Sequence, residues 1–70
     1  MNPTIQIQLN GTPHQLADGT RVAELIEQLA LTPQRVALEL NWEILPRAQW
    51  TEQLLRDGDK VEIVHFVGGG

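Results

Sequence analysis

The sequence predicts an α+β domain in which one main helix packs on one face of a mixed β-sheet. Three observations support this prediction: segments of alternating apolar and polar residues, one segment with helical spacing, and turn residues at the junctions. With 70 residues, the chain has room for one small domain. A domain of this size buries only about 60% of the surface that its unfolded chain exposes, so a large catalytic cleft is not expected.

The N-terminal segment predicts a β-hairpin. Residues 4–9 alternate apolar and polar side chains, which is typical of a half-buried strand. Asn10-Gly11 accepts the positive φ angles of a tight turn, and residues 14–17 are long enough to return as a short strand.

One amphipathic helix is predicted over residues 21–30. Four apolar residues recur there at helical spacing, namely Val22, Leu25, Ile26 and Leu29. Thr20 is predicted as the N-cap. The helix is expected to end at Thr32-Pro33, because the residue before a proline is disfavoured in the helical region.

Alternation resumes after the helix and predicts a third strand at residues 36–41. Residues 41–43 then read as a turn, and residues 44–45 as a very short strand. Pro46 prevents this strand from continuing inside a ladder, because proline has no N–H to donate.

The last strand gives the strongest signal in the chain. A loop or helical turn at residues 47–55 and a turn at residues 57–59 precede a β-branched and aromatic run at residues 61–67. The resulting order of elements is a β-grasp arrangement. We therefore predict a β-grasp domain over residues 1–67, followed by a flexible glycine tail at residues 68–70.

Nothing in this chain is expected to cover the second face of the sheet. If Val61 and Ile63 face the helix, alternation places Val64 and Phe66 on the open side. Together these two side chains suggest a surface on which a partner docks, although single exposed apolar residues are common.

The composition argues against several classes of binding partner and cellular location. Five Lys and Arg against nine Asp and Glu give a net charge of -4, which argues against nucleic-acid binding. The absence of cysteine excludes disulfides and a cysteine nucleophile. No apolar run approaches the roughly 20 residues of a membrane span, and the start of the chain does not resemble a signal peptide. We therefore expect a cytoplasmic protein without a membrane partner.

Motifs of catalytic and metal sites are missing from the sequence. There is no phosphate-binding glycine loop, and His14 and His65 are too isolated for a metal site or a catalytic triad, so none is expected. Asp57 and Asp59 flank a glycine, which favours a backbone turn over acid-base chemistry. Either tryptophan could anchor a partner. Packing is favoured for Trp50, and the role of Trp42 stays open.

The chain ends on Gly68-Gly69-Gly70 directly after the last strand. Composition alone also fits a linker, but we expect a free α-carboxylate at Gly70, ionised at neutral pH. Glycines do not block a narrow channel, and the four residues from Val67 onward reach roughly 13 Å when extended. Such a tail would let Gly70 enter a partner's active site while the body stays outside. The chemistry that this permits is activation of the carboxylate by ATP as an acyl adenylate, from which a sulfur nucleophile could displace AMP.

Three blocks of sequence follow one another in an order typical of a known family. They are LNWEILPR at residues 40–47 with Trp50 three residues on, LRDGDKVEIV at residues 55–64, and HFVGGG at residues 65–70. Together they resemble the ThiS family, the ubiquitin-like β-grasp sulfur carriers of thiamin biosynthesis. The resemblance covers essentially the whole chain. It departs at Trp42, where the family often has a smaller residue.

The resemblance implies a carrier that acts as a co-substrate, binds no cofactor itself and is not an enzyme. A ThiF-like adenylating enzyme would use ATP and Mg to convert the Gly70 carboxylate to an adenylate. A persulfide, drawn from cysteine by a cysteine desulfurase, would then give a thiocarboxylate. The thiazole synthase ThiG would take this sulfur to form the thiazole phosphate of thiamin. Val67, Gly68 and Gly69 would lie in the part of the tail that the partners enclose.

Three alternatives remain. The first is the small subunit of molybdopterin synthase, which shares the fold and the sulfur chemistry but generally has a longer chain. The second is a ubiquitin-like modifier joined to lysines of other proteins. The third is a passive binding module that uses Val64 and Phe66 while the tail is idle.

Overall fold

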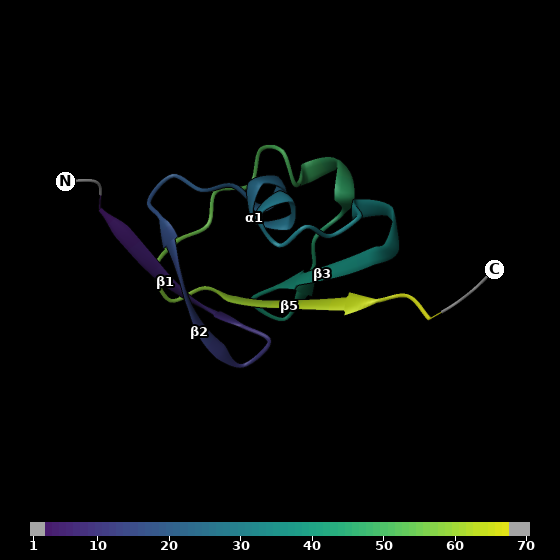
Figure 1. The fold of residues 1–70 in the computed structure, drawn as a ribbon, viewed down its shortest axis with the longest axis horizontal. Coiled ribbons are helices and arrows are strands. Elements are labelled where there is room, and N and C mark those ends of the chain that lie inside the picture. The colour runs from purple at the N-terminus through teal and green to yellow at the C-terminus, as the bar shows by residue number, and fades with distance from the viewer. Residues whose placement is uncertain (1–2, 68–70) are drawn as a thin grey trace.

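The computed structural model describes residues 3–67, which form a five-stranded mixed sheet with an α-helix on one side (Figure 1). The strands are β1 (Thr4–Leu9), β2 (Thr12–Ala17), β3 (Val36–Leu40), β4 (Glu43–Ile44) and β5 (Lys60–His65), and the helix is α1 (Val22–Gln28). Their order in the sheet is β2-β1-β5-β3-β4. β5 runs parallel to β1 and antiparallel to β3. The predicted α+β class and mixed sheet are confirmed.

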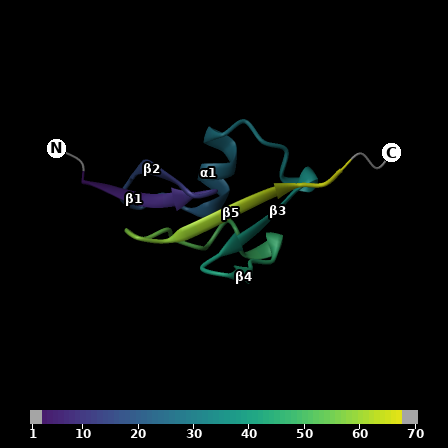
Figure 2. The same cartoon turned by 90° about the horizontal axis from the view of Figure 1, so that it is seen from below.

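The core lies between α1 and the sheet. Its buried apolar side chains come from every strand except β4, from α1 and from the segment before β5, and include Ile5, Ile7, Leu16, Val22, Leu25, Ile26, Val36, Leu38, Trp50, Leu55, Val61 and Ile63. The segment between β4 and β5 lies on the same side as α1 in Figure 1. In the view from below, the strands follow one another from β2 to β4 (Figure 2). Among residues 3–67, no element covers this second face.

The helix begins one residue later than predicted. Its N-cap is Arg21, whose backbone is extended and whose N–H donates to Oε1 of Glu24 at 2.9 Å. The prediction of Thr20 as N-cap was wrong. Thr20 is buried, and its hydroxyl donates to the carbonyl oxygen of Ala17 at 2.7 Å instead. Its side chain is thus used by the turn that precedes the helix.

The helix also ends earlier than predicted, at Gln28. Ala30 adopts a left-handed backbone with φ of 57°, and the N–H of Leu31 donates to the carbonyl oxygen of Ile26 at 3.1 Å. This is the hydrogen-bond pattern of a Schellman motif, which ends a helix without a proline. A short 3-10 helix, η1 (Pro33–Arg35), then leads into β3.

The last strand ends at His65 rather than at Val67. His65 pairs with Val36, the first residue of β3, so no strand remains beside the next two residues. The N–H of Phe66 still donates to the carbonyl oxygen of Arg35 at 2.9 Å. The predicted glycine tail at residues 68–70 lies outside the described residues.

Candidate functional site

β5 holds the chain in the sheet as far as His65, two residues before the last described residue. It lies between β1 and β3, and its Val61 and Ile63 are buried in the core. A 3-10 helix, η2 (Arg47–Gln49), provides a further support. The Arg47 guanidinium donates from Nε to the carbonyl oxygen of Pro33 at 2.9 Å and from Nη2 to that of Val36 at 3.1 Å. Arg47 therefore fixes residues 33–36, which lie next to the end of β5. The sequence reasoning missed this role.

The two predicted docking residues are exposed. Val64 is 55% exposed on β5, opposite Ala37 of β3, and Phe66 is 58% exposed just beyond the strand. The buried Val61 and Ile63 confirm the alternation that placed Val64 on the face away from α1. Val67 is 97% exposed. Gly68, Gly69 and Gly70, the other predicted site residues, lie outside the described residues.

Ile44 is an exposed apolar residue that the sequence reasoning did not identify as part of this face. It is 65% exposed on β4 and pairs with Glu39 of β3, which pairs in turn with Glu62 of β5. The side chains of Ile44, Glu39 and Glu62, which lie side by side on the three strands, therefore point away from α1. Leu45 packs against the core, so alternation in the predicted short strand contained the signal for an outward Ile44.

The two tryptophans have different environments. Trp50 is 3% exposed, and its indole N–H donates to the carbonyl oxygen of Leu45 at 2.9 Å, which confirms the favoured packing role. Trp42 is 71% exposed in the turn between β3 and β4. Its φ is 73° and that of Asn41 is 52°, nearly the angles of Asn10 and Gly11 in the first hairpin. Trp42 thus occupies a position where glycine is favoured.

Replacing Trp42 with glycine is expected to raise the free energy of unfolding by about 1 kcal/mol, because a left-handed backbone costs a residue with a Cβ roughly 1–2 kcal/mol. The exposed ring offers little burial to offset this strain. Urea denaturation of the two proteins measures the difference. A destabilised Trp42→Gly variant would show that the ring contributes to packing.

Asp57 and Asp59, which precede β5, accept hydrogen bonds from backbone N–H groups. Oδ1 of Asp57 accepts from the N–H of Gln6 at 2.8 Å, and Oδ2 of Asp59 accepts from the N–H of Arg56 at 2.8 Å. The predicted turn is confirmed. Within residues 3–67, no three His, Cys, Asp or Glu side chains are grouped so that they would hold a metal ion. No helix in this described part is long and apolar enough to span a membrane.

Comparisons with known proteins identify the family. The model of the ThiS family matches residues 7–70. The sulfur carrier protein ThiS of Escherichia coli (strain K12) is 38% identical over 66 residues, which span 94% of this chain and 100% of that protein. The crystal structure of the thiamine biosynthesis protein ThiS from Geobacter metallireducens superposes with a TM-score of 0.82 at 35% identity. That superposition covers 94% of this chain and 100% of that chain.

A second group of relatives is much longer. The thiazole synthase of Magnetococcus marinus is 38% identical over 66 residues, which are 94% of this chain and 20% of that protein. The chain therefore spans about a fifth of the length of this relative. Because the family match runs from Ile7 to Gly70 and the relative from Escherichia coli is matched over its whole length, the chain belongs to the ThiS family.

Proposed function

We propose that the chain is a sulfur carrier protein of thiamin biosynthesis, and that it acts as a co-substrate of other enzymes without catalysing a reaction itself. The main support is that the family match extends through Gly70 and that a relative matched over its whole length is named a sulfur carrier. The fold supports the proposal because the central strand β5 ends at His65, and only Phe66 and Val67 separate it from the glycines in the sequence.

The proposed chemistry begins at the Gly70 carboxylate, which attacks the α-phosphorus of ATP in a ThiF-like enzyme that uses Mg. An acyl adenylate forms and pyrophosphate leaves. The outer sulfur of a persulfide, supplied by a cysteine desulfurase, then attacks the acyl carbon and AMP leaves. A thiol cleaves the resulting acyl disulfide, which oxidises that thiol to a disulfide and releases the Gly70 thiocarboxylate. This chemistry needs a reducing compartment, so we place the carrier in the cytoplasm.

Delivery of the sulfur is proposed to take place in the thiazole synthase ThiG. Support comes from the thiazole synthase of Magnetococcus marinus, part of which is similar to almost the whole of this chain. From Val67 onward, an extended tail reaches roughly 13 Å, so the folded body would stay outside the active site.

The face of the sheet away from α1 is the proposed docking surface, formed by Ile44, Val64 and Phe66. Val64 lies near the C-terminal end of β5. Pairing with β3 and the hydrogen bond from the Phe66 N–H to the carbonyl oxygen of Arg35 hold that end in place. A partner that binds this face would therefore also fix the starting point of the tail. This arrangement lowers the entropy lost when the Gly70 carboxylate is positioned for reaction.

The test is an intact and fragment mass spectrum after incubation with a ThiF-type enzyme, MgATP, cysteine and a desulfurase. The expected result is exchange of one oxygen for sulfur, localised to Gly70 by fragmentation. Fragmentation is needed because oxidation of Met1 gives nearly the same gain in mass. An adenylate that never acquires sulfur would favour a protein modifier instead. An unmodified Gly70 beside an active partner enzyme would contradict the proposal.

A further inference from the structure

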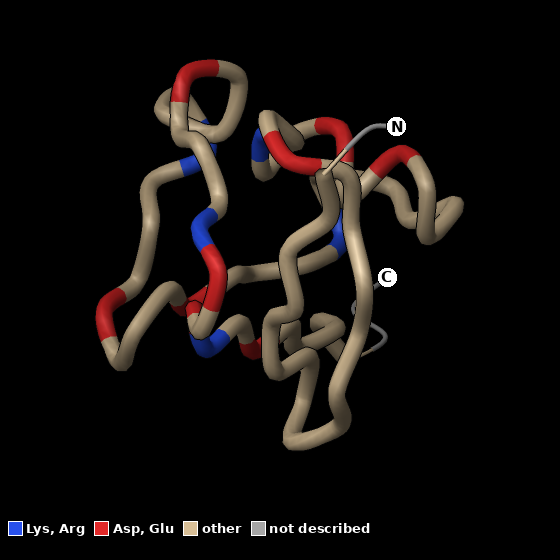
Figure 3. Tube along the Cα trace, turned by 90° about the vertical axis from the view of Figure 1, so that its left-hand side faces the viewer, with Lys and Arg blue, Asp and Glu red and all other residues tan. Residues whose placement is uncertain are grey.

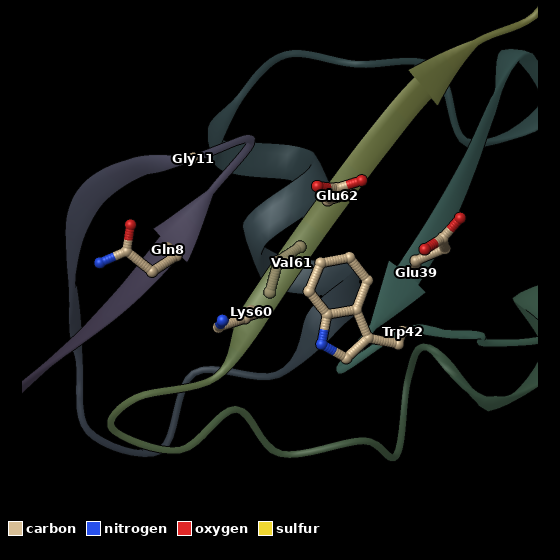
Figure 4. A pocket seen from close by; sticks show the side chains of 7 residues that line it. All are labelled: Gln8, Gly11, Glu39, Trp42, Lys60, Val61 and Glu62. Carbon is tan, nitrogen blue, oxygen red and sulfur yellow. The ribbon is translucent and has the colours of Figure 1, made fainter.

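A hollow of about 340 Å³ opens on the face of the sheet away from α1, among β1, β3 and β5. Its lining includes Gln8, Glu39, Trp42, Lys60 and Glu62 (Figure 4). Figure 4 shows the ring of Trp42 between β5 and β3, with Lys60 toward one side and the two carboxylates toward the other. The hollow lies on the same face as Val64, two and four residues after Glu62 and Lys60 along β5.

The Trp42 ring already accepts a cation. The ammonium of Lys60 lies 5.4 Å from the centroid of this ring, within the range of a cation–π contact. Trp42 is also 71% exposed and has a left-handed backbone, so the fold gains little from a large side chain here. Strain at an exposed residue is often retained for a functional reason.

Charge in the hollow favours a second cation. Glu39 and Glu62 are direct partners across β3 and β5, and like charges at such a position destabilise a sheet. Lys60 contributes one positive charge to the lining against these two carboxylates, which leaves the hollow negative. By contrast, the β1–β2 hairpin has no Lys, Arg, Asp or Glu, as its tan trace shows (Figure 3). The negative charge of the open face is thus concentrated beside Trp42.

We propose that this hollow binds an arginine side chain of the protein that docks on the open face. The guanidinium stacks on Trp42 in place of the Lys60 ammonium and donates hydrogen bonds to the carboxylates of Glu39 and Glu62. Arginine fits better than lysine, because its planar fork both stacks on an aromatic ring and donates to two carboxylate oxygens. The identity of the docking protein, the adenylating enzyme, rests on the proposed function. The hollow itself does not involve the tail.

The first test uses the full chain labelled with ¹⁵N and the peptide acetyl-Gly-Arg-Gly-amide, with a citrulline peptide as the uncharged control. We expect saturable shifts of the Trp42 indole signal with a dissociation constant on the order of millimolar. The indole of Trp50, which is buried and bonded to Leu45, is the internal reference and is expected not to move. No saturable shift at Trp42, or an equal shift with citrulline, would overturn the proposal.

Two pairs of Glu→Gln substitutions distinguish binding in the hollow from the effect of the overall charge of the chain. Glu39→Gln with Glu62→Gln is expected to weaken arginine peptide binding about tenfold, which corresponds to about 1.4 kcal/mol. Glu27→Gln with Glu52→Gln removes the same charge from exposed positions outside the hollow and is expected to change binding less than about twofold. Lys60→Gln is expected to strengthen binding about threefold, because it removes the competing cation. Equal weakening by both pairs of Glu variants would contradict a local site.

The second test measures binding of the same variants to a ThiF-type enzyme by titration calorimetry. If only the variant with Glu39→Gln and Glu62→Gln binds the enzyme more weakly, the result supports binding of an arginine of this enzyme in the hollow. An unchanged affinity, beside normal peptide binding, would overturn the assignment of the partner. Failure of the proposed function would be seen separately, as a mass spectrum without sulfur at Gly70 in the unaltered chain.

Discussion

Removal of Gly70 is expected to abolish thiocarboxylate formation while the fold stays unchanged. The reacting acyl carbon belongs to this residue in the proposed cycle, and the shortened chain would place its new terminal carboxylate roughly 3.3 Å short of the adenylation site. A misplacement of only about 1 Å can cost on the order of 100-fold in rate. We therefore expect at least a loss of this size in the rate at which sulfur appears in the intact mass spectrum.

One alanine added after Gly70 is the matched change in the opposite direction. The carboxylate then extends past the reactive position, and the Cβ narrows the approach to the acyl carbon, so the loss is expected to be as large. Both variants leave residues 3–67 untouched, so their urea denaturation curves should overlay that of the unaltered chain. Normal sulfur transfer by either variant would refute the assignment of Gly70 as the acyl group.

The strands and the core were largely predictable from local pattern. Alternation in residues 4–9 fixed which side of β1 is buried, and the same reasoning placed Val61 and Ile63 in the core and Val64 outside. These predictions succeeded because one side of each strand must be removed from water. The pattern needs no knowledge of distant residues.

The errors arose where distant segments decide the outcome. The run at residues 61–67 favours a strand to its end, but β3 begins at Val36 and leaves the last two residues without a partner. Similarly, Thr20 suits an N-cap by residue type, yet its hydroxyl is used by Ala17 and its carbonyl oxygen accepts from Leu55 at 2.9 Å. Such competition between hydrogen bonds is not visible in a local window.

The candidate site was predictable only in part for the same reason. Val64 and Phe66 follow from alternation along one strand. The hollow beside Trp42 instead joins Gln8 to Lys60 and Glu39 to Glu62 through the pairing of three strands, two of which lie more than 50 residues apart. Sequence order separates these residues. The parallel pairing of β1 with β5 and the antiparallel pairing of β3 with β5 bring them together.

Replacing Phe66 with aspartate is expected to weaken binding to the adenylating enzyme about 30-fold or more, close to 2 kcal/mol, as for a hot-spot aromatic residue. Phe66 is 58% exposed and its backbone N–H bond to Arg35 is retained in the variant. The effect on the free energy of unfolding is therefore expected to stay below about 1 kcal/mol. Titration calorimetry with the enzyme and thermal denaturation of the free chain measure the two effects.

Leu54→Asp is the matched control for Phe66→Asp, because it places the same charge at an apolar residue that is 40% exposed but lies outside the open face. Leu54 forms an isolated bridge with Arg21 at the start of α1, on the side of the sheet away from the proposed docking surface. If Phe66 anchors a partner, only the Phe66 variant loses affinity. If the Phe66 variant instead loses thermal stability at unchanged affinity, the ring belongs to the packing of residues 3–67 and the docking surface must be sought elsewhere.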